Sequence, residues 1–297
     1  MSPYTLLGPD GTKFHLRTWE PAAAPAGLAI ALVHGLGEHS GRYVELVAHL
    51  TEHGYPVIAM DLRGHGRSTG KRGHAPTYEA LMDDIELLLG AARERFPGVR
   101  LVLYGHSFGG NLVINYVLRR RPDLAGLIAM SPALRPAFHP PGWKLGLGRM
   151  LYRVWPSLTL YSEVDMRGVS RDQSVVRAAQ ADPLAHDRIS ARLGLDLLQA
   201  GEWALQQAHT LAIPTLLMHG DSDRVTSATA SREFARRASL CTLRIWQGLY
   251  HELHHEPEKA AVFTEITRWL ESLPRPTQRT DPVLPASAHS LTKLPSR

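Results

Sequence analysis

Short apolar runs alternate with amphipathic segments along most of this chain. Apolar runs typical of buried strands cover residues 28–33, 57–60, 101–104 and 126–130. Segments with the apolar spacing of helices lie between or after them, at residues 43–53, 78–95 and from 111 onward. Near-continuous apolar strands separated by helices indicate a parallel sheet that is covered on both faces. Residues 14–19 alternate between apolar and polar side chains, which predicts an additional antiparallel strand at the edge of that sheet.

The alternation is interrupted in the second half of the chain. Residues 134–208 contain no strand-like run and are rich in Pro, Gly, Trp and Arg. Strand-like runs then return at residues 214–218 and 242–246, and helical segments at 228–237 and 257–270. We therefore predict an α/β core formed by residues 1–133 and 209–273, with residues 134–208 inserted as a helical cap. Residues 274–297 have few large apolar side chains and are predicted to be disordered.

The composition is that of an ordinary globular protein. The chain has 297 residues, of which 44% are hydrophobic, and a single cysteine, which excludes a disulfide framework. The first ten residues lack the basic and apolar regions of a secretion signal. No run approaches the roughly 18 apolar residues that span a membrane. A cytoplasmic protein is therefore expected, and peripheral contact with a membrane surface is compatible with this expectation.

The chain carries a small excess of positive charge. Its 33 basic and 28 acidic residues give a net charge of +5, but the basic residues are scattered. The one tight cluster, Arg119 to Arg121, lies at the end of a predicted helix, where positive charge complements the helix dipole. No nucleic-acid partner is therefore expected, whereas a mildly basic surface favours contact with anionic lipid.

Ser107 lies between a predicted strand and a predicted helix, in the sequence Gly105-His-Ser-Phe-Gly109. The pattern G-x-S-x-G alone is weak, because glycine and serine are common residues. A strand before it and a helix after it are the context of a nucleophile elbow, a strained turn that exposes the serine hydroxyl. We therefore predict that Ser107 is a nucleophile rather than a helix-capping serine.

A serine nucleophile needs a base, an acid that orients the base, and donors for the developing oxyanion. In parallel sheets such groups gather at the carboxyl ends of the strands. Asp221 and Asp223 follow one predicted strand, and His251 follows the next, with His254 and His255 as alternative bases. The order Ser, Asp, His along the chain is that of the α/β-hydrolase triad.

A glycine-rich turn, His34-Gly-Leu-Gly37, follows the first core strand. Such a turn can direct a backbone N–H at the oxyanion. The N–H of Phe108, directly after the nucleophile, is the expected second donor.

Five motifs form a combination that is more specific than G-x-S-x-G. They are His34-Gly-Leu-Gly-Glu-His-Ser-Gly-Arg-Tyr43, Asp61-Leu-Arg-Gly-His-Gly-Arg-Ser68, Gly105-His-Ser-Phe-Gly-Gly110, Gly220-Asp-Ser-Asp-Arg224 and Tyr250-His-Glu-Leu-His-His-Glu256. Together they resemble the monoacylglycerol lipase family of serine hydrolases and the bacterial lysophospholipases of that group. The resemblance covers about residues 14–270 and is weaker in the cap. It implies an α/β-hydrolase fold, with a mostly parallel central sheet flanked by helices and an inserted helical cap, and a reaction that requires no metal or cofactor.

The resemblance also assigns the catalytic groups. The catalytic Asp of the family immediately precedes an Arg, which selects Asp223 over Asp221. It makes His251 the base, and the backbone N–H groups of Leu36 and Phe108 the oxyanion donors. Phe108 stands where the family commonly has Met, which leaves a backbone role unaffected.

Three further residues match the family near the glycerol end of the substrate. These are Glu38, Arg42 and His254. The resemblance therefore predicts a lipid ester as the substrate, with cleavage of monoacylglycerol to fatty acid and glycerol as the favoured activity. A lysophospholipase and a broad carboxylesterase are the open alternatives, and the sequence makes no prediction of the acyl chain length or the oligomeric state.

Two other classes of function compete with a serine hydrolase. The stretch His251-Glu-Leu-His-His255 satisfies H-E-x-x-H, a zinc-hydrolase signature that requires both histidines on one face of a helix. Pro257 fits the first turn of a helix that begins after this motif, so residues 251–255 are predicted to form a loop. A non-catalytic binding protein on the same fold is the second alternative, and it is disfavoured because all three triad residues are present.

The cap contains a segment of mixed character at residues 141–155, where Trp, Leu and Met alternate with Lys and Arg. Such a segment is typical of an interfacial helix that makes transient contact with a membrane surface. It is equally typical of a cap helix that packs its apolar side on the core. Both interpretations remain open from the sequence.

Overall fold

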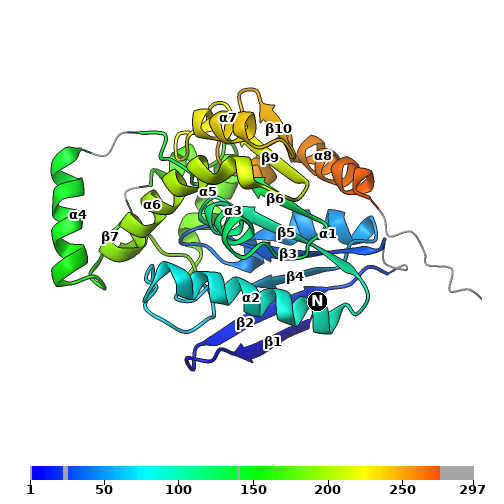
Figure 1. The fold of residues 1–297 in the computed structure, drawn as a ribbon, viewed down its shortest axis with the longest axis horizontal. Coiled ribbons are helices and arrows are strands. Elements are labelled where there is room, and N and C mark those ends of the chain that lie inside the picture. Colours follow the sequence, from blue (N-terminus) through cyan, green and yellow to red (C-terminus); the bar gives the residue numbers. More distant parts are fainter. Residues whose placement is uncertain (1, 23–25, 139–140, 163, 275–297) are drawn as a thin grey trace, which may run out of the picture.

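The centre of the molecule is a mostly parallel sheet (Figure 1). The computed structural model describes residues 2–22, 26–138, 141–162 and 164–274, and within them the sheet has eight strands. In spatial order these are β1 (Ser2–Leu7), β2 (Lys13–Trp19), β4 (Val57–Met60), β3 (Leu28–Val33), β5 (Arg100–His106), β6 (Gly126–Met130), β9 (Thr215–Gly220) and β10 (Cys241–Trp246). The strands from β4 to β10 are parallel to one another, whereas β1 and β2 are antiparallel to their neighbours.

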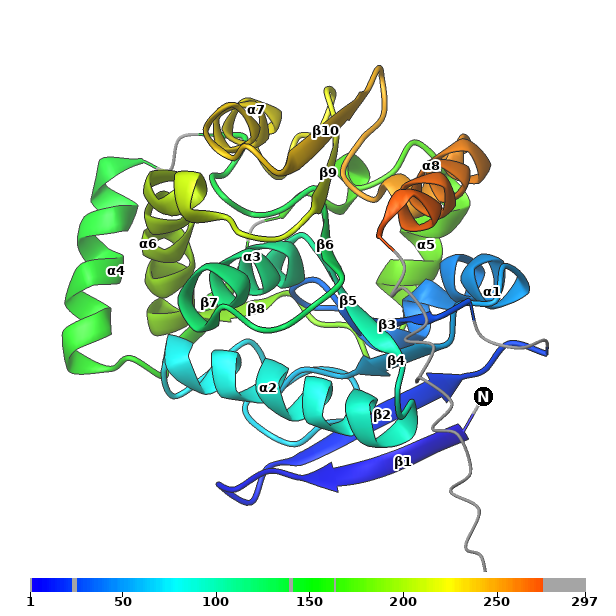
Figure 2. The same ribbon diagram turned by 45° about the vertical axis from the view of Figure 1, so that its right-hand side comes forward.

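Helices cover both faces of this sheet (Figure 2). They are α1 (Val44–Glu52) and α8 (Lys259–Ser272) on one face, and α2 (Tyr78–Arg95), α3 (Phe108–Arg120) and α7 (Ala228–Arg237) on the other. Alternate residues of a strand point to opposite faces, so β3 supplies two separate cores, Ala29, Ala31 and Val33 to one and Leu28, Ile30 and Leu32 to the other. The predicted parallel sheet with two covered faces, in the arrangement of an α/β-hydrolase, is confirmed.

A second group of elements lies between β6 and β9 in the sequence. It consists of α4 (Gly142–Val154), β7 (Thr159–Tyr161), α5 (Gln173–Ala181), β8 (Arg188–Ser190) and α6 (Ala191–Gln207). β7 and β8 pair as a small antiparallel sheet, so the expectation of no strand in this region is wrong. Strands of three residues are too short to show a period of two in the sequence.

Some of these inserted elements are hydrogen-bonded to the core, whereas others lie at the outside of the molecule. The segment around β8 is hydrogen-bonded to core loops, because the N–H of His186 donates to the carbonyl of Gly37 and that of Ser190 to the carbonyl of Gly73, both at 2.8 Å. By contrast, α4 packs against α6 at the outer edge of the molecule, and each of its residues is exposed or half-buried (Figure 1).

The two ends of the chain differ from expectation in different ways. The antiparallel strand predicted over residues 14–19 is β2, but it lies inside the sheet because β1 pairs with its outer side. The side chains of β1 described from Pro3 onward are mostly exposed, so the strand leaves no apolar alternation in the sequence. The disorder predicted for residues 274–297 concerns a segment of which only Pro274 lies within the described residues.

The strand order places a crevice at the carboxyl ends of β3 and β5. The chain passes from β3 to β4 on one side and then returns to β5 on the other side of β3. The loops that leave β3 and β5 therefore diverge, and ligands bind at such a switch point in open α/β sheets.

Candidate active site

Ser107 occupies a strained turn between β5 and α3. Its φ of 55° and ψ of −115° are rare for a residue with a side chain, and such a conformation costs on the order of 1–3 kcal/mol unless its surroundings enforce it. A Cβ atom at Gly105 would collide with the carbonyl oxygen of Gly109, and one at Gly109 with that of His34. These two glycines therefore allow the strand, the helix and the loop after β3 to approach closely around the serine. The predicted strand–serine–helix context is confirmed.

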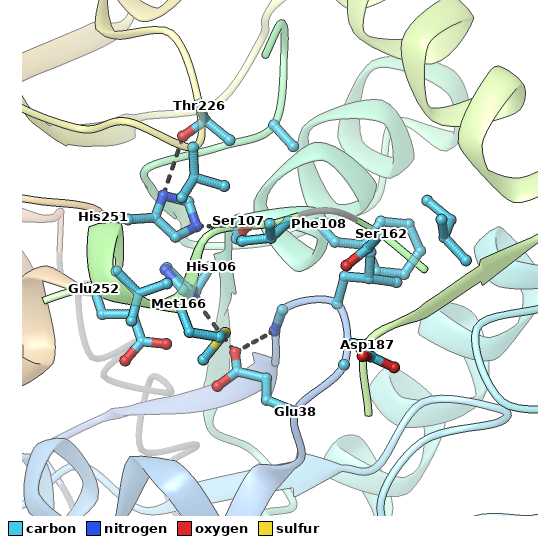
Figure 3. A pocket seen from close by; sticks show the side chains of 18 of the residues that line it. Glu38, His106, Ser107, Phe108, Ser162, Met166, Asp187, Thr226, His251 and Glu252 are labelled. Atoms are coloured by element: carbon cyan, nitrogen blue, oxygen red, sulfur yellow. Dashed lines mark hydrogen bonds and ion pairs between the residues drawn. The ribbon is translucent and has the colours of Figure 1, made fainter. Parts of the chain in front are cut away.

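Ser107, His251 and Asp223 form a hydrogen-bonded chain of three side chains, of which Figure 3 shows Ser107 and His251. The Nε2 atom of His251 lies 2.8 Å from the Ser107 Oγ, and its Nδ1 atom lies 2.7 Å from Oδ2 of Asp223. With Nδ1–H donating to the carboxylate, Nε2 is free to accept the proton of the serine hydroxyl. The structure thus brings together one residue from the end of β5, one from the loop after β9 and one from the loop after β10.

The carboxylate of Asp223 is held by donors on both of its oxygens. Oδ1 accepts from the backbone N–H groups of Val225 at 2.7 Å and Thr226 at 2.9 Å. Oδ2 accepts from the Thr226 hydroxyl at 2.8 Å and lies 3.0 Å from Nε2 of His219. Burial raises the pKa of this carboxyl, but the contacts with His251 and His219 outweigh burial and hold the pKa far below its ordinary value. Asp223 is therefore a permanent negative charge behind His251.

The other acidic candidate, Asp221, is exposed at the surface. Its Oδ1 accepts from the N–H of Gly248 at 2.7 Å, which ties the loop after β10 to the loop after β9. Asp221 is thus placed to order a turn, whereas Asp223 is placed to orient His251.

The buried imidazole of His251 is tuned by two opposing effects. Burial lowers its pKa, and the adjacent Asp223 carboxylate raises it, with the net result above the ordinary value for histidine. A base with a raised pKa holds the transferred proton more firmly, which assists removal of the proton from a serine hydroxyl.

His219 is a site residue that sequence reasoning assigns only to packing at a strand end. Its Nδ1 atom lies 2.8 Å from the Ser231 hydroxyl, so the imidazole can accept there and donate from Nε2 to Asp223. The signal in the sequence is its spacing of four residues from Asp223, which is ambiguous in a chain with 16 histidines.

The expected oxyanion donors, Leu36 and Phe108, both line the cavity that contains Ser107. Phe108 is the first residue of α3, and first-turn N–H groups have no acceptor within their own helix. Leu36 lies in a turn that is fixed from both sides, because the N–H of Gly35 donates to Glu38 at 2.6 Å and the carbonyl of Gly37 accepts from the N–H of His186.

Glu38 supports this turn from within the buried core of the site. Its Oε1 atom accepts from the N–H of Gly35 and the hydroxyl of Tyr43, both at 2.6 Å, and lies 3.2 Å from Nδ1 of His106. Burial raises the pKa of the Glu38 carboxyl, but His106 and Arg42 outweigh burial, so the pKa lies well below its ordinary value. Glu38 therefore also lines the cavity as a carboxylate.

The other two residues expected near the glycerol end are placed differently from each other. Arg42 lines the cavity beside Glu38. His254 does not belong to the described cavity lining; it is 1% exposed, and its ring stacks on Tyr43 with the centroids 4.7 Å apart. Glu252, to which the sequence analysis assigns no role in a serine hydrolase, lines the cavity instead.

The cavity itself has a volume of about 690 Å³ and lies between the core loops and the inserted elements. Its lining contains apolar side chains, including Leu36, Phe108, Phe138, Ile189, Leu197 and Leu198, and polar ones, including Gln180, Asp182 and His186. Glu38, Arg42 and Glu252 also line it and contact one another, so they form one charged cluster. Ser107 thus faces a space that can accept both an apolar chain and a polar group.

The H-E-x-x-H stretch does not form the helical face that a zinc site requires. Residues Leu253–His255 form one turn of 3-10 helix, and the imidazoles of His251 and His255 are engaged in different directions. His251 contacts Asp223 and Ser107, whereas His255 contacts Glu252 and the carbonyl of Arg42.

Comparisons with known proteins agree on the kind of chain this is. The profile of the family described as "Serine aminopeptidase, S33" (Hydrolase_4) matches residues 24–258. The chain is 32% identical over 274 residues to a monoacylglycerol lipase of Mycolicibacterium smegmatis, covering 91% of this chain and 97% of that protein. It is 37% identical over 270 residues to an uncharacterized abhydrolase domain-containing protein of Dictyostelium discoideum, covering 90% of this chain but only 28% of that longer protein. The crystal structure of the Paleococcus ferrophilus monoacylglycerol lipase is similar with a TM-score of 0.78 and 35% identity, over 86% of this chain and 98% of the other.

Proposed function

The chain belongs to the serine aminopeptidase S33 family of α/β-hydrolases, together with its monoacylglycerol lipase members, and from this premise we propose that it cleaves monoacylglycerol to fatty acid and glycerol. One observation carries the proposal: the hydrogen-bonded Ser107–His251–Asp223 chain lies at a cavity lined by many apolar side chains and by the charged cluster of Glu38, Arg42 and Glu252. A monoacylglycerol likewise combines an apolar acyl chain with a polar glycerol.

In the proposed reaction the acyl group is transferred twice, first to Ser107 and then to water. Ser107 Oγ forms a bond to the ester carbonyl carbon while Nε2 of His251 takes the hydroxyl proton. The backbone N–H groups of Leu36 and Phe108 stabilise the oxyanion, and His251 returns the proton to the glycerol oxygen as the carbon–oxygen bond breaks. Water then attacks the acyl-enzyme with His251 again as the base, which releases the fatty acid and restores Ser107. No step requires a metal or cofactor.

Different lining residues are assigned to the two parts of the substrate. We assign the acyl chain to the apolar side chains that include Leu197 and Leu198, and the glycerol to the charged cluster of Glu38, Arg42 and Glu252. Charged carboxylates accept hydrogen bonds from hydroxyl groups, so this cluster is suited to a polyol. The buried position of His254 makes it a support for Tyr43 in this assignment rather than a substrate contact.

The substrate class is tested by a hydrolysis panel. We expect kcat/KM to be highest for 1- and 2-monoacylglycerols, compared with lysophosphatidylcholine and p-nitrophenyl esters of the same acyl length. A preference for lysophosphatidylcholine would replace the proposal with a lysophospholipase, and uniform rates would indicate a broad carboxylesterase. Hydrolysis should persist in the presence of a strong chelator and be abolished by a serine-directed phosphonate. Loss of hydrolysis with the chelator but not with the phosphonate would indicate the zinc alternative. Absence of hydrolysis of every ester would indicate a binding protein.

We further propose that α4 makes transient contact with a membrane surface that holds the substrate. Trp143, Leu147, Met150 and Val154 recur every three or four residues and share one face of α4, and Trp143 and Val154 are 68% and 78% exposed. Exposed apolar side chains beside basic ones are typical of helices that lie in the membrane interface. Among the helices in the described part of the chain, none has the length and apolarity needed to cross a bilayer.

A double variant, Trp143→Gln with Leu147→Gln, should lose activity on monoacylglycerol in vesicles while keeping activity on a soluble short-chain ester. The physical reason is that both side chains are exposed and contribute little to packing, so their loss affects interface binding alone. Initial rates on the two substrates measure the split. Leu240→Gln, which alters a 46% exposed leucine outside the inserted elements, is the matched control and should change neither rate. Equal losses on both substrates would contradict membrane contact through α4.

A further inference from the structure

The guanidinium of Arg42 lines the cavity but is already bound by two carboxylates. Its Nη1 donates to Oε1 of Glu252 at 2.9 Å and to Oε2 of Glu38 at 3.3 Å, and its Nη2 donates to Oε2 of Glu252 at 2.8 Å. The contact with Glu252 is the bidentate fork by which arginine recognises carboxylates and phosphates. Glu252 therefore occupies the geometry that an anionic ligand would need.

All three side chains are nearly removed from solvent. The side chain of Arg42 is 11% exposed, and those of Glu38 and Glu252 are 5% exposed each. Burial raises the pKa of the Glu252 carboxyl, but Arg42 and His255 together outweigh burial and lower the pKa to about 2. The wall of the cavity thus contains two ionised carboxylates and one arginine whose Nη1 and Nη2 atoms already donate hydrogen bonds to those carboxylates.

Glu252 is held in this position from several sides. Its backbone N–H donates to the carbonyl of Val169 at 2.7 Å, and His255 contacts its Oε2 from behind the cavity wall at 2.8 Å. It also directly follows His251, so the same loop positions the base and this carboxylate (Figure 3). A carboxylate fixed in this way cannot move aside easily for a competing anion.

We infer that Glu252 is a specificity residue that excludes anionic leaving groups and admits neutral or cationic ones. This inference rests on the proposed ester hydrolysis and concerns the alcohol that the same site releases. A phosphate or carboxylate on the alcohol would approach Glu38 and Glu252 in a poorly solvated space, where like charges repel strongly. It would also find the fork of Arg42 occupied. Hydroxyl or ammonium groups would instead meet hydrogen-bond acceptors, so selectivity comes from a repulsive element as well as an attractive one.

Glu252→Gln tests the inference, because glutamine keeps the shape of the side chain and removes its charge. Three esters with one acyl chain are compared: acylglycerol, acylglycerol phosphate and acylcholine. In the unmodified protein, kcat/KM for acylglycerol phosphate should be at least about a hundredfold below that for acylglycerol. In Glu252→Gln the ratio of kcat/KM for acylglycerol to kcat/KM for acylglycerol phosphate should fall by at least about tenfold, because the fork of Arg42 becomes available to phosphate.

Asp187→Asn is the matched control. Asp187 lines the same cavity but pairs with Arg188 and has no contact with Arg42, so its variant removes one negative charge and should leave the ratio unchanged. An unchanged ratio in Glu252→Gln, or an equal change in Asp187→Asn, would overturn the inference while leaving ester hydrolysis intact. Absence of hydrolysis of every ester by the unmodified protein would instead contradict the proposed function.

A measurement on the unmodified protein covers the case in which Glu252→Gln does not fold. Glycerol and glycerol 3-phosphate are compared as inhibitors of a soluble ester. Glycerol 3-phosphate should inhibit at least about tenfold more weakly, because it differs from glycerol by the anionic group. Equal or tighter inhibition by glycerol 3-phosphate would overturn the inference.

Discussion

Replacing Ser107 with alanine is expected to reduce kcat by at least about a thousandfold, which corresponds to about 4 kcal/mol of transition-state stabilisation. The Oγ atom of Ser107 lies 2.8 Å from the base and is the atom that forms the acyl bond in the proposed mechanism. Alanine removes that atom but retains the Cβ, so the strained turn at φ 55° is preserved and the fold should remain intact. Release of p-nitrophenol from an ester, together with a thermal melt, separates loss of chemistry from loss of structure.

Ser222→Ala is the control for this experiment. Ser222 lies in the loop after β9 close to the same site, but its hydroxyl contacts Asp221 at 3.1 Å rather than His251. Its variant should keep activity close to that of the unmodified protein. Near-normal activity in Ser107→Ala would refute the assignment of the nucleophile, whereas a large loss in Ser222→Ala would show that the loop tolerates no change.

Asp223→Asn is expected to lower kcat by about 10³–10⁴-fold, and Asp221→Asn by less than about threefold. An amide in place of the Asp223 carboxylate carries no charge, so His251 would lose the anion that raises its pKa and the acceptor that fixes its Nδ1–H tautomer. An amide in place of the Asp221 carboxylate can still accept from the N–H of Gly248, so its turn would be retained. The two variants make the same chemical change in the same loop. Steady-state values of kcat for both, measured on one ester, give the difference between their effects.

The pH profile of the Asp223→Asn variant gives a second readout. Loss of the carboxylate should move the acidic limb of kcat/KM to lower pH, because the neutral base would then persist to lower pH. A larger loss in Asp221→Asn than in Asp223→Asn would exchange the roles of the two residues.

Most of the sheet could be predicted because its strands are buried on both faces. Such strands appear as uninterrupted apolar runs, and Leu28–Val33, Val57–Met60 and Gly126–Met130 begin and end where those runs do. The three missed strands lack this signal. β1 is largely exposed, and β7 and β8 have three residues each, so their pairing depends on tertiary context rather than on local pattern.

The candidate site could be predicted as far as its residues follow strand ends in motifs. Ser107, Asp223 and His251 come from three separate loops, and a parallel sheet brings such loops to one edge. Residues alone left Asp221 and Asp223 as equals; the family resemblance favoured Asp223, and burial beside His251 agrees with that choice. Glu252 was missed because its contact with Arg42 joins positions 210 residues apart, which no local pattern can show.

The hydrogen bonds between the inserted elements and the core determine how freely this architecture can be modified. His186 is bonded to the turn that carries Leu36, Ser190 to the loop at Gly73, and Val169 to the residue after the base. The inner part of the insertion is therefore tied to the loops of the candidate site, and exchanging it for the corresponding segment of another protein should disturb the turn that carries Leu36. By contrast, α4 packs on α6, away from that turn, and has no buried residue. Substitutions in α4 that change how the protein contacts its substrate should therefore have little effect on the residues around Ser107.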